Sequence, residues 1–269
     1  MRTKVIAALG SVALAATLLA GCGGDDDDKI TVGIKFDQPG LGLKSGDTYS
    51  GFDVDVARYV AKELGFSAEQ ITFKESPSPQ RENLLQSGQV DMIVATYSIT
   101  DTRKEKVSFA GPYFVAGQGL LVQESNTDIT GPETLNGKKL CSVQGSTPAQ
   151  KIKDEFASEV QLQEFDTYSK CVEQLAAGTI DAVTTDDIIL AGFAAQTQYK
   201  GKLKVVGTTF SQENYGIGLP KGSDRCQKVT DAITKMISSG EWAKALEANT
   251  GAAYTPNKDL NPPTPAACS

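Results

Sequence analysis

The chain has 269 residues, and 40% of them are hydrophobic, which is enough to bury one large core or two smaller ones and excludes a mainly disordered protein. Its formal net charge of −7, with no basic patch in the sequence, argues against nucleic acid as a partner. The absence of His excludes His-based acid–base and triad chemistry, and the spacing of the five Cys fits no zinc motif. We therefore expect no metal and no cofactor.

The N-terminus has the pattern of an export signal. Arg2 and Lys4 precede an apolar run over 5–20, which is shorter than the roughly 20 residues of a spanning helix. The run ends in Leu-Leu-Ala-Gly-Cys, which resembles a bacterial lipobox, so we expect residues 1–21 to be removed and Cys22 to be lipidated. This places the protein at the outer face of the cytoplasmic membrane and leaves a mature net charge of −9.

Residues 22–28 form an acidic segment that is too polar to pack, so we interpret it as a tether. The stretch from Asp25 to Lys29 also spells an enteropeptidase recognition sequence. An engineered junction is therefore an alternative to a natural tether.

After the tether, apolar periodicity predicts strands alternating with helices. We predict strands over 30–34, 71–73 and 92–95 and helices over 52–64 and 81–86. This alternation is typical of an α/β fold with a doubly wound, mostly parallel sheet.

The segment over 84–94 recurs at 174–184, with Gly88 aligned to Gly178 and Asp91 to Asp181. In both copies a helix end meets a Gly suited to a helix C-terminus, and a buried strand follows. Each copy also comes after an opening strand, which in the second half is expected over 139–143. We therefore predict two similar lobes, each built on its own sheet.

Two segments, 111–115 and 214–222, are expected to cross between the lobes, and helices are expected over 226–246. Lobe 1 then comprises 29–113 and 216–269, and lobe 2 comprises 114–215. Ligands of open α/β sheets bind beyond the carboxyl ends of the strands. Lys35, a cation that directly follows the first strand of an acidic chain, is one candidate for this cleft.

Four motifs in order resemble the extracellular solute-binding proteins for polar amino acids, over nearly all of residues 29–250. They are GFDVDVARYVAKEL (51–64), SITDTRKEKVSFAGPYF (98–114), AGTIDAVTTDD (177–187) and YGIGLPKG (215–222). The resemblance implies a two-lobed type II periplasmic-binding-protein fold with two hinge strands. It also implies a monomer that is not an enzyme and that delivers an amino acid to the permease subunits of an ABC importer.

The family's motif residues carry over to particular positions of this chain. The resemblance implies that Arg103 binds the ligand α-carboxylate and that Asp186 binds the α-ammonium. Thr96, Ser98, Ser146 and Thr147 are expected to supply further donors and acceptors around the ligand. A planar guanidinium suits a carboxylate because it forms two parallel hydrogen bonds.

Lys35 and Arg81 resemble the bases of family members that bind acidic amino acids, so we expect glutamate, or aspartate, as the ligand. The chain looks most like glutamate-binding lipoproteins of high-GC Gram-positive bacteria, although the turn over 37–42 departs from Gram-negative acidic-amino-acid binders. Alternatives are glutamine or asparagine binding, a dehydratase-type enzyme, or a ligand sensor on the same fold. The alternative interpretation of Lys35 is a surface lysine that extends its charge into solvent and has no ligand role.

With Cys22 lipidated, four Cys remain in an exported protein, which suggests two disulfides and leaves three pairings open. The two-lobed fold that the resemblance implies favours Cys141 with Cys171 in lobe 2. It favours Cys226 with Cys268 in lobe 1. Neither bond would then cross the cleft.

Overall fold

The computed structural model describes residues 29–156 and 160–269. The expected signal peptide, Cys22 and the acidic tether lie outside the described residues. Within those two ranges, no helix combines the length and the apolar character needed to cross a bilayer.

The sheet of the first lobe has the strand order β5-β1-β6-β13-β7. The strands are β1 (Ile30–Ile34), β5 (Ile71–Glu75), β6 (Met92–Ile93), β7 (Val107–Ala116) and β13 (Glu213–Pro220). β1 runs parallel to β5 and β6, whereas β13 is antiparallel to β6 and β7. The sheet is therefore mixed, because β13 runs against the direction of the other four strands.

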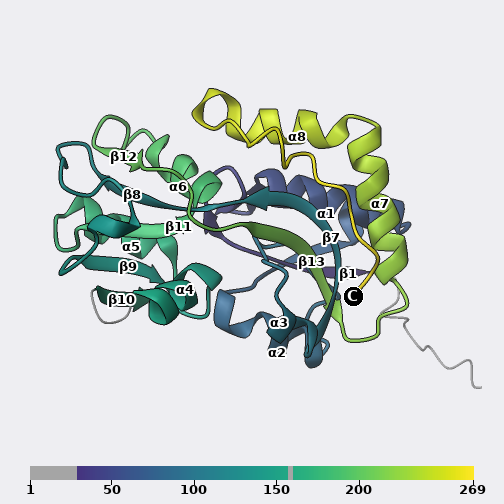
Figure 1. The fold of residues 1–269 in the computed structure, drawn as a ribbon. Coiled ribbons are helices and arrows are strands. Elements are labelled where there is room, and N and C mark those ends of the chain that lie inside the picture. Colours follow the sequence, from purple (N-terminus) through teal and green to yellow (C-terminus); the bar gives the residue numbers. More distant parts are fainter. Residues whose placement is uncertain (1–28, 157–159) are drawn as a thin grey trace, which may run out of the picture.

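Helices cover both faces of this sheet (Figure 1). They are α1 (Phe52–Glu63), α7 (Cys226–Ser238) and α8 (Glu241–Thr250) on one face, and α2 (Arg81–Gln86) and α3 (Asp101–Lys104) on the other. α1 forms as predicted because its apolar residues recur at helical spacing and are buried, while Lys62 complements the dipole in its last turn.

The second sheet has the order β10-β9-β11-β8-β12. Its strands are β8 (Gln118–Gln123), β9 (Lys139–Val143), β10 (Gln161–Phe165), β11 (Ala182–Asp186) and β12 (Leu203–Val206), with helices α4 (Thr147–Glu155), α5 (Tyr168–Ala176) and α6 (Asp187–Ala194). Our sequence analysis did not predict β10 and β12. Both are edge strands: three of the five residues of β10 are exposed, and β12 has only one fully buried residue, so neither forms a buried run.

Short elements complete the fold. The segment where we expected only a turn forms a small antiparallel sheet of β2 (Asp37–Gln38), β3 (Gly42–Ser45) and β4 (Thr48–Ser50). Single 3₁₀ turns occur at Ala68–Gln70, Ser78–Gln80, Pro132–Thr134 and Gly251–Ala253.

The repeated segment makes the same contacts in both lobes. The Asp91 carboxylate accepts a hydrogen bond from the Thr31 amide at 2.7 Å, and the Asp181 carboxylate accepts one from the Lys139 amide, also at 2.7 Å. Thr31 lies on β1 and Lys139 on β9, and these strands run parallel to β6 and β11, the strands that follow Asp91 and Asp181. Each Asp therefore ties a helix–strand turn to the start of the neighbouring strand.

The C-terminal tail packs along β7, one of the two segments that pass between the lobes (Figure 1). The Asn261 side chain accepts from the Val115 amide at 2.9 Å and donates to the Val115 carbonyl at 2.8 Å. The Ala266 amide donates to the Gly111 carbonyl at 2.8 Å. The tail thus extends the first lobe at its sheet edge.

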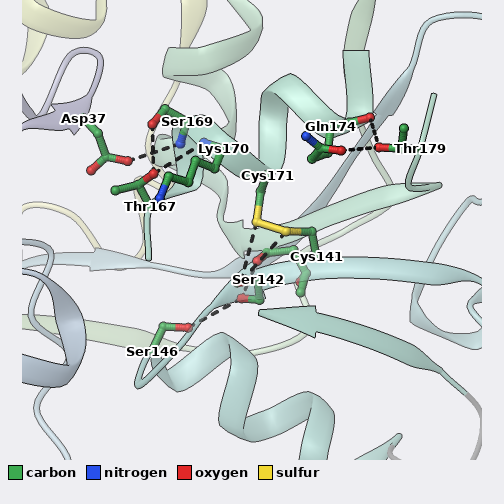
Figure 2. The surroundings of a disulfide bond; sticks show 11 residues. Asp37, Cys141, Ser142, Ser146, Thr167, Ser169, Lys170, Cys171, Gln174 and Thr179 are labelled. Carbon is green, nitrogen blue, oxygen red and sulfur yellow. Dashed lines mark hydrogen bonds between the residues drawn. A yellow bond between two sulfur atoms is a disulfide. The ribbon is translucent and has the colours of Figure 1, made fainter. Parts of the chain in front are cut away.

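Two disulfides are present, Cys141–Cys171 and Cys226–Cys268, the pairs that the two-lobed fold favours. The first joins β9 to α5 in the second lobe (Figure 2). The second joins the start of α7 to the C-terminal tail. Each bond lies within one lobe, so neither restrains one lobe against the other.

Candidate ligand-binding site

A narrow cavity lies between the two lobes at the carboxyl ends of their strands. The first lobe contributes Ser78, Arg81 and Thr96, and the second contributes Ser146, Thr147, Pro148, Tyr168, Thr185, Asp186 and Ile189. The lining is mostly polar, although it is buried. A ligand for this cavity must therefore offer several hydrogen-bonding groups in place of water.

Arg81 begins α2 and is 2% exposed. Its Nη1 donates to the Ala95 carbonyl at 2.9 Å, and its guanidinium lies 4.2 Å from the ring centroid of Tyr97. Burial, followed by the nearby charge of Arg103, lowers the pKa of Arg81 to about 10, so it stays cationic at neutral pH. Its Nε has no hydrogen-bond partner within the described ranges, which leaves a buried donor at the cavity.

Lys35 follows β1 and is 3% exposed, so the interpretation as a surface lysine does not fit. Its Nζ donates to Ser78 Oγ at 3.1 Å, which places the ammonium behind a residue of the cavity wall. Burial and then the charge of Arg81 lower the pKa of Lys35 to about 8. Lys35 is therefore a buried cation that adjoins the cavity without lining it.

Arg103 on α3 reaches both lobes. Its Nη1 donates to the Ser98 carbonyl at 2.8 Å, and its Nη2 donates to the Gly145 carbonyl of the second lobe at 3.1 Å. On its other side, Nε lies 3.4 Å from the Glu82 carboxylate, which also accepts from Tyr97 Oη at 2.7 Å. Arg103 lines the wider mouth of the cleft, which shares Ser78, Ser146 and Thr147 with the narrow cavity.

Asp186 ends β11 on the opposite side of the cavity. One carboxylate oxygen accepts a hydrogen bond from Tyr215 Oη, while Oδ1 is buried with no partner within the described ranges. Burial, with repulsion from Glu213, raises the pKa of Asp186 well above its usual range. A cationic group placed against Oδ1 would favour the carboxylate form, because it would satisfy the acceptor and offset the buried charge.

Hydroxyl groups connect the two lobes beside these charges. Ser98 Oγ and Thr147 Oγ1 are 3.1 Å apart, and Thr147 Oγ1 donates to the Glu213 carboxylate at 2.8 Å. Ser146 Oγ accepts from the Ala149 amide at 3.1 Å and caps α4, the helix whose N-terminus faces the cleft.

Five of the eight predicted site residues line the narrow cavity: Arg81, Thr96, Ser146, Thr147 and Asp186. Arg103 lines the mouth. Ser98 reaches the cavity wall through Thr147, and Lys35 reaches it through Ser78. All eight are thus gathered at one cleft, although two of them contact it through a neighbour.

Several residues of the site were absent from our sequence analysis. Tyr97 lies beside both Arg81 and Arg103, whose guanidinium is 5.0 Å from its ring centroid. The Glu82 carboxylate pairs with Arg103, and the Tyr215 hydroxyl donates a hydrogen bond to Asp186. Glu82 and Tyr97 directly follow predicted residues, but adjacency alone does not distinguish a site residue from a core residue.

Contacts outside the cavity also join the lobes. The Asp37 carboxylate of β2 accepts from the Ser169 amide at the start of α5 at 3.2 Å (Figure 2). On α6, a Cβ at Gly192 would lie 2.2 Å from the Pro39 carbonyl oxygen. The small β2–β4 sheet therefore packs closely against two helices of the second lobe.

The cavity combines an unpaired buried donor, Arg81 Nε, with an unpaired buried acceptor, Asp186 Oδ1. A zwitterion with an additional acidic group matches this arrangement, because each of its charges would find an opposite partner. In the described parts of the chain, no cluster of three or more His, Cys, Asp or Glu could hold a metal ion.

Two α/β lobes that close on a polar cavity define a ligand-binding protein with a type II periplasmic-binding-protein fold. The chain belongs to the bacterial extracellular solute-binding proteins, family 3. The model of this family matches residues 30–252. This assignment fits the order of the strands, the two crossing segments and the position of the cavity.

Three similar proteins differ in the ligand that their names give. A glutamate-binding protein of Corynebacterium glutamicum is 47% identical, covering 93% of this chain and 91% of its own. An ABC transporter glutamine-binding protein of Bacillus subtilis is 39% identical, covering 81% and 79% respectively. The solved structure of an ancestral arginine-binding protein bound to arginine has a TM-score of 0.77 and 34% identity, covering 83% of this chain and 99% of its own. Because the ligands in these names have different side chains, the ligand of this chain must be inferred from the charges of its own cavity.

Proposed function

We propose that this protein binds L-glutamate, or aspartate, in the cleft and delivers it to the permease subunits of an ABC importer. The observation that carries the proposal is the gathering of three buried cations at one cleft of an acidic chain: Lys35, Arg81 and Arg103. A ligand with one net negative charge offsets their mutual repulsion. Glutamine lacks the distal carboxylate, so it would leave Arg81 and Lys35 without a carboxylate partner.

In this proposal, Arg103 binds the α-carboxylate and Asp186 binds the α-ammonium. The unpaired Arg81 Nε, with Lys35 behind Ser78, binds the distal carboxylate. Thr96, Ser98, Ser146 and Thr147 complete the wall. Because the arginines and Asp186 lie on different lobes, ligand binding favours the closed arrangement.

The proposal also includes where the protein is located and how its chain divides between the lobes. Residues 1–21 direct export, lipidated Cys22 holds a monomer at the membrane, and residues 22–28 act as the tether. The lobes divide as 29–113 with 216–269 and as 114–215. The family and the absence of His from the sequence support a transport protein rather than a dehydratase-type enzyme.

Isothermal titration of the purified protein with glutamate, aspartate, glutamine and arginine tests the ligand. We expect glutamate or aspartate to bind at least tenfold more tightly than glutamine, and arginine to produce no heat of binding. Tighter binding of glutamine than of both acidic amino acids would overturn the proposed ligand while leaving the family assignment intact. Turnover of any of the four would contradict the transport function.

A further inference from the structure

Thr96, which lines the cavity, has an uncommon backbone conformation. Thr96 has φ of 46°, and in the described ranges it is the one residue other than glycine with positive φ. A β-branched residue adopts this left-handed conformation at a cost in free energy, and it persists where the surroundings determine it. Thr96 is buried and lines the cavity, so the strained residue is part of the candidate site.

Charged groups bind both ends of the peptide between Ala95 and Thr96. Its carbonyl oxygen, on Ala95, accepts from Arg81 Nη1 at 2.9 Å. Its amide nitrogen, on Thr96, donates to Asp53 Oδ2 at 2.9 Å. A cation at the oxygen and an anion at the nitrogen both match the peptide dipole, and hydrogen bonds to charged groups are about twice as strong as neutral ones.

Asp53, which accepts from the Thr96 amide, does not itself line the cavity. It lies in the first turn of α1 with no exposed surface. Its Oδ1 accepts from Tyr113 Oη at 2.7 Å. Burial raises the pKa of Asp53 to about 6, and the hydrogen bonds from Tyr113 and Thr96 oppose this rise, so the group is mainly a carboxylate at neutral pH.

A buried carboxylate is costly unless it is paired, so its two hydrogen bonds account for how it is tolerated there. They do not account for the strained residue at the end of one of them. The α1 N-terminus favours an anion, and it fixes Asp53 on a rigid element. Asp53 is therefore placed to hold the Thr96 backbone rather than to contact a ligand.

We propose that Asp53 is a positioning residue of the ligand site. By accepting from the Thr96 amide, it holds Thr96 in its left-handed backbone conformation. The held Ala95–Thr96 peptide presents Thr96 to the cavity and gives the Arg81 guanidinium a fixed carbonyl to bind. This inference rests on the proposed function, and it assigns a role in that function to a residue outside the cavity wall.

A double-mutant cycle tests the role. Asp53→Asn keeps one acceptor oxygen but removes the charge, and Thr96→Gly removes the strain because glycine adopts positive φ freely. We expect Asp53→Asn to weaken L-glutamate binding about fivefold by calorimetry in the wild-type background. In the Thr96→Gly background, the same change should weaken binding less than twofold.

Tyr113→Phe is the matched control, because it removes the other hydrogen bond of Asp53 and leaves the Thr96 contact in place. It should lower the thermal stability while leaving the affinity for L-glutamate within twofold. In NMR spectra, the Thr96 amide proton should move upfield in Asp53→Asn as its charged acceptor is lost, and remain near its position in Tyr113→Phe.

An equal loss of affinity in both backgrounds, or stability changes without a change in affinity, would overturn the positioning role. The two proposals fail differently. If the wild-type protein binds no acidic amino acid, the proposed function fails. If it binds L-glutamate and Asp53→Asn binds equally well, only the role of Asp53 fails.

Discussion

Lobe 1 and lobe 2 contribute opposite charges to the cleft. Lobe 1 supplies three buried cations, Lys35, Arg81 and Arg103, whereas lobe 2 supplies the Asp186 carboxylate, four hydroxyl groups and the N-terminus of α4. Glu82 pairs with Arg103 within lobe 1, so Arg81 and Lys35 are the cations that an acidic group of the ligand would stabilise. In the proposed function, the ligand's acidic groups are therefore recognised mainly by lobe 1. Closure then brings Asp186 of lobe 2 against the ligand's ammonium group.

Removal of Arg103 is expected to have the largest effect on ligand binding, because its guanidinium donates hydrogen bonds to carbonyl groups of both lobes. Truncating one partner of a buried charge pair commonly costs about 2–5 kcal/mol. We therefore expect Arg103→Ala to weaken glutamate binding by about thirtyfold to several thousandfold in calorimetry. Lys104→Ala, a change at a partly exposed neighbour in the same helix, should bind like the wild type. Retention of affinity by Arg103→Ala would refute its assignment to the α-carboxylate.

Asp186→Asn tests the carboxylate that lobe 2 contributes to the narrow cavity. An amide can still accept one hydrogen bond but cannot neutralise an ammonium, so we expect about a thirtyfold loss of affinity, roughly 2 kcal/mol. The loss should be similar for glutamate and glutamine, since both carry the same α-ammonium. A loss confined to glutamate, measured by parallel titrations, would place Asp186 at the wrong end of the ligand.

Lys35 gives a pH-dependent prediction. Its pKa is lowered from 10.5 to about 8, so the free protein loses this cation above pH 8 and glutamate affinity should fall there by up to tenfold per pH unit. Between about pH 8 and 10.5 the folded chain holds fewer protons than the unfolded chain. The contribution of Lys35 to the free energy of unfolding therefore rises with pH while ligand affinity falls.

Lys35→Met separates this effect from titration of the ligand ammonium. We expect it to weaken glutamate about tenfold more than glutamine at pH 7, because only glutamate carries the distal carboxylate. The component of the pH dependence that belongs to Lys35 should also disappear. Equal losses for the two ligands, or an unchanged pH profile, would exclude Lys35 from the anion pocket.

The smallest expected effect concerns closure rather than ligand contact. Asp37→Ala removes the hydrogen bond to the Ser169 amide that joins β2 to α5 across the lobes. A partly exposed contact of this kind contributes about 0.5–1 kcal/mol, so affinity for every ligand should fall by about two- to fivefold. Calorimetry with glutamate and glutamine would check it, and a change in their ratio would show that Asp37 acts on the pocket instead.

Local patterns in the sequence predicted most of the central elements and the family, and they gave the candidate site residues. Apolar residues at helical spacing specify α1, and the repeated Gly and Asp fix the same turn in both lobes, because these signals depend on neighbours within the chain. Charged residues at strand ends likewise indicated a cleft, since parallel strands end at one edge of a sheet.

Only the tertiary structure decided how those charges are satisfied. That Lys35 lies behind Ser78, that Tyr97 contacts two guanidinium groups, and that Asp53 holds the Thr96 amide depend on residues from different elements meeting in space. Burial then sets the electrostatics, because the same lysine or carboxylate has an ordinary pKa in water and a shifted one when desolvated. The sequence therefore identified the charges, while packing determined which of them are paired and which remain for a ligand.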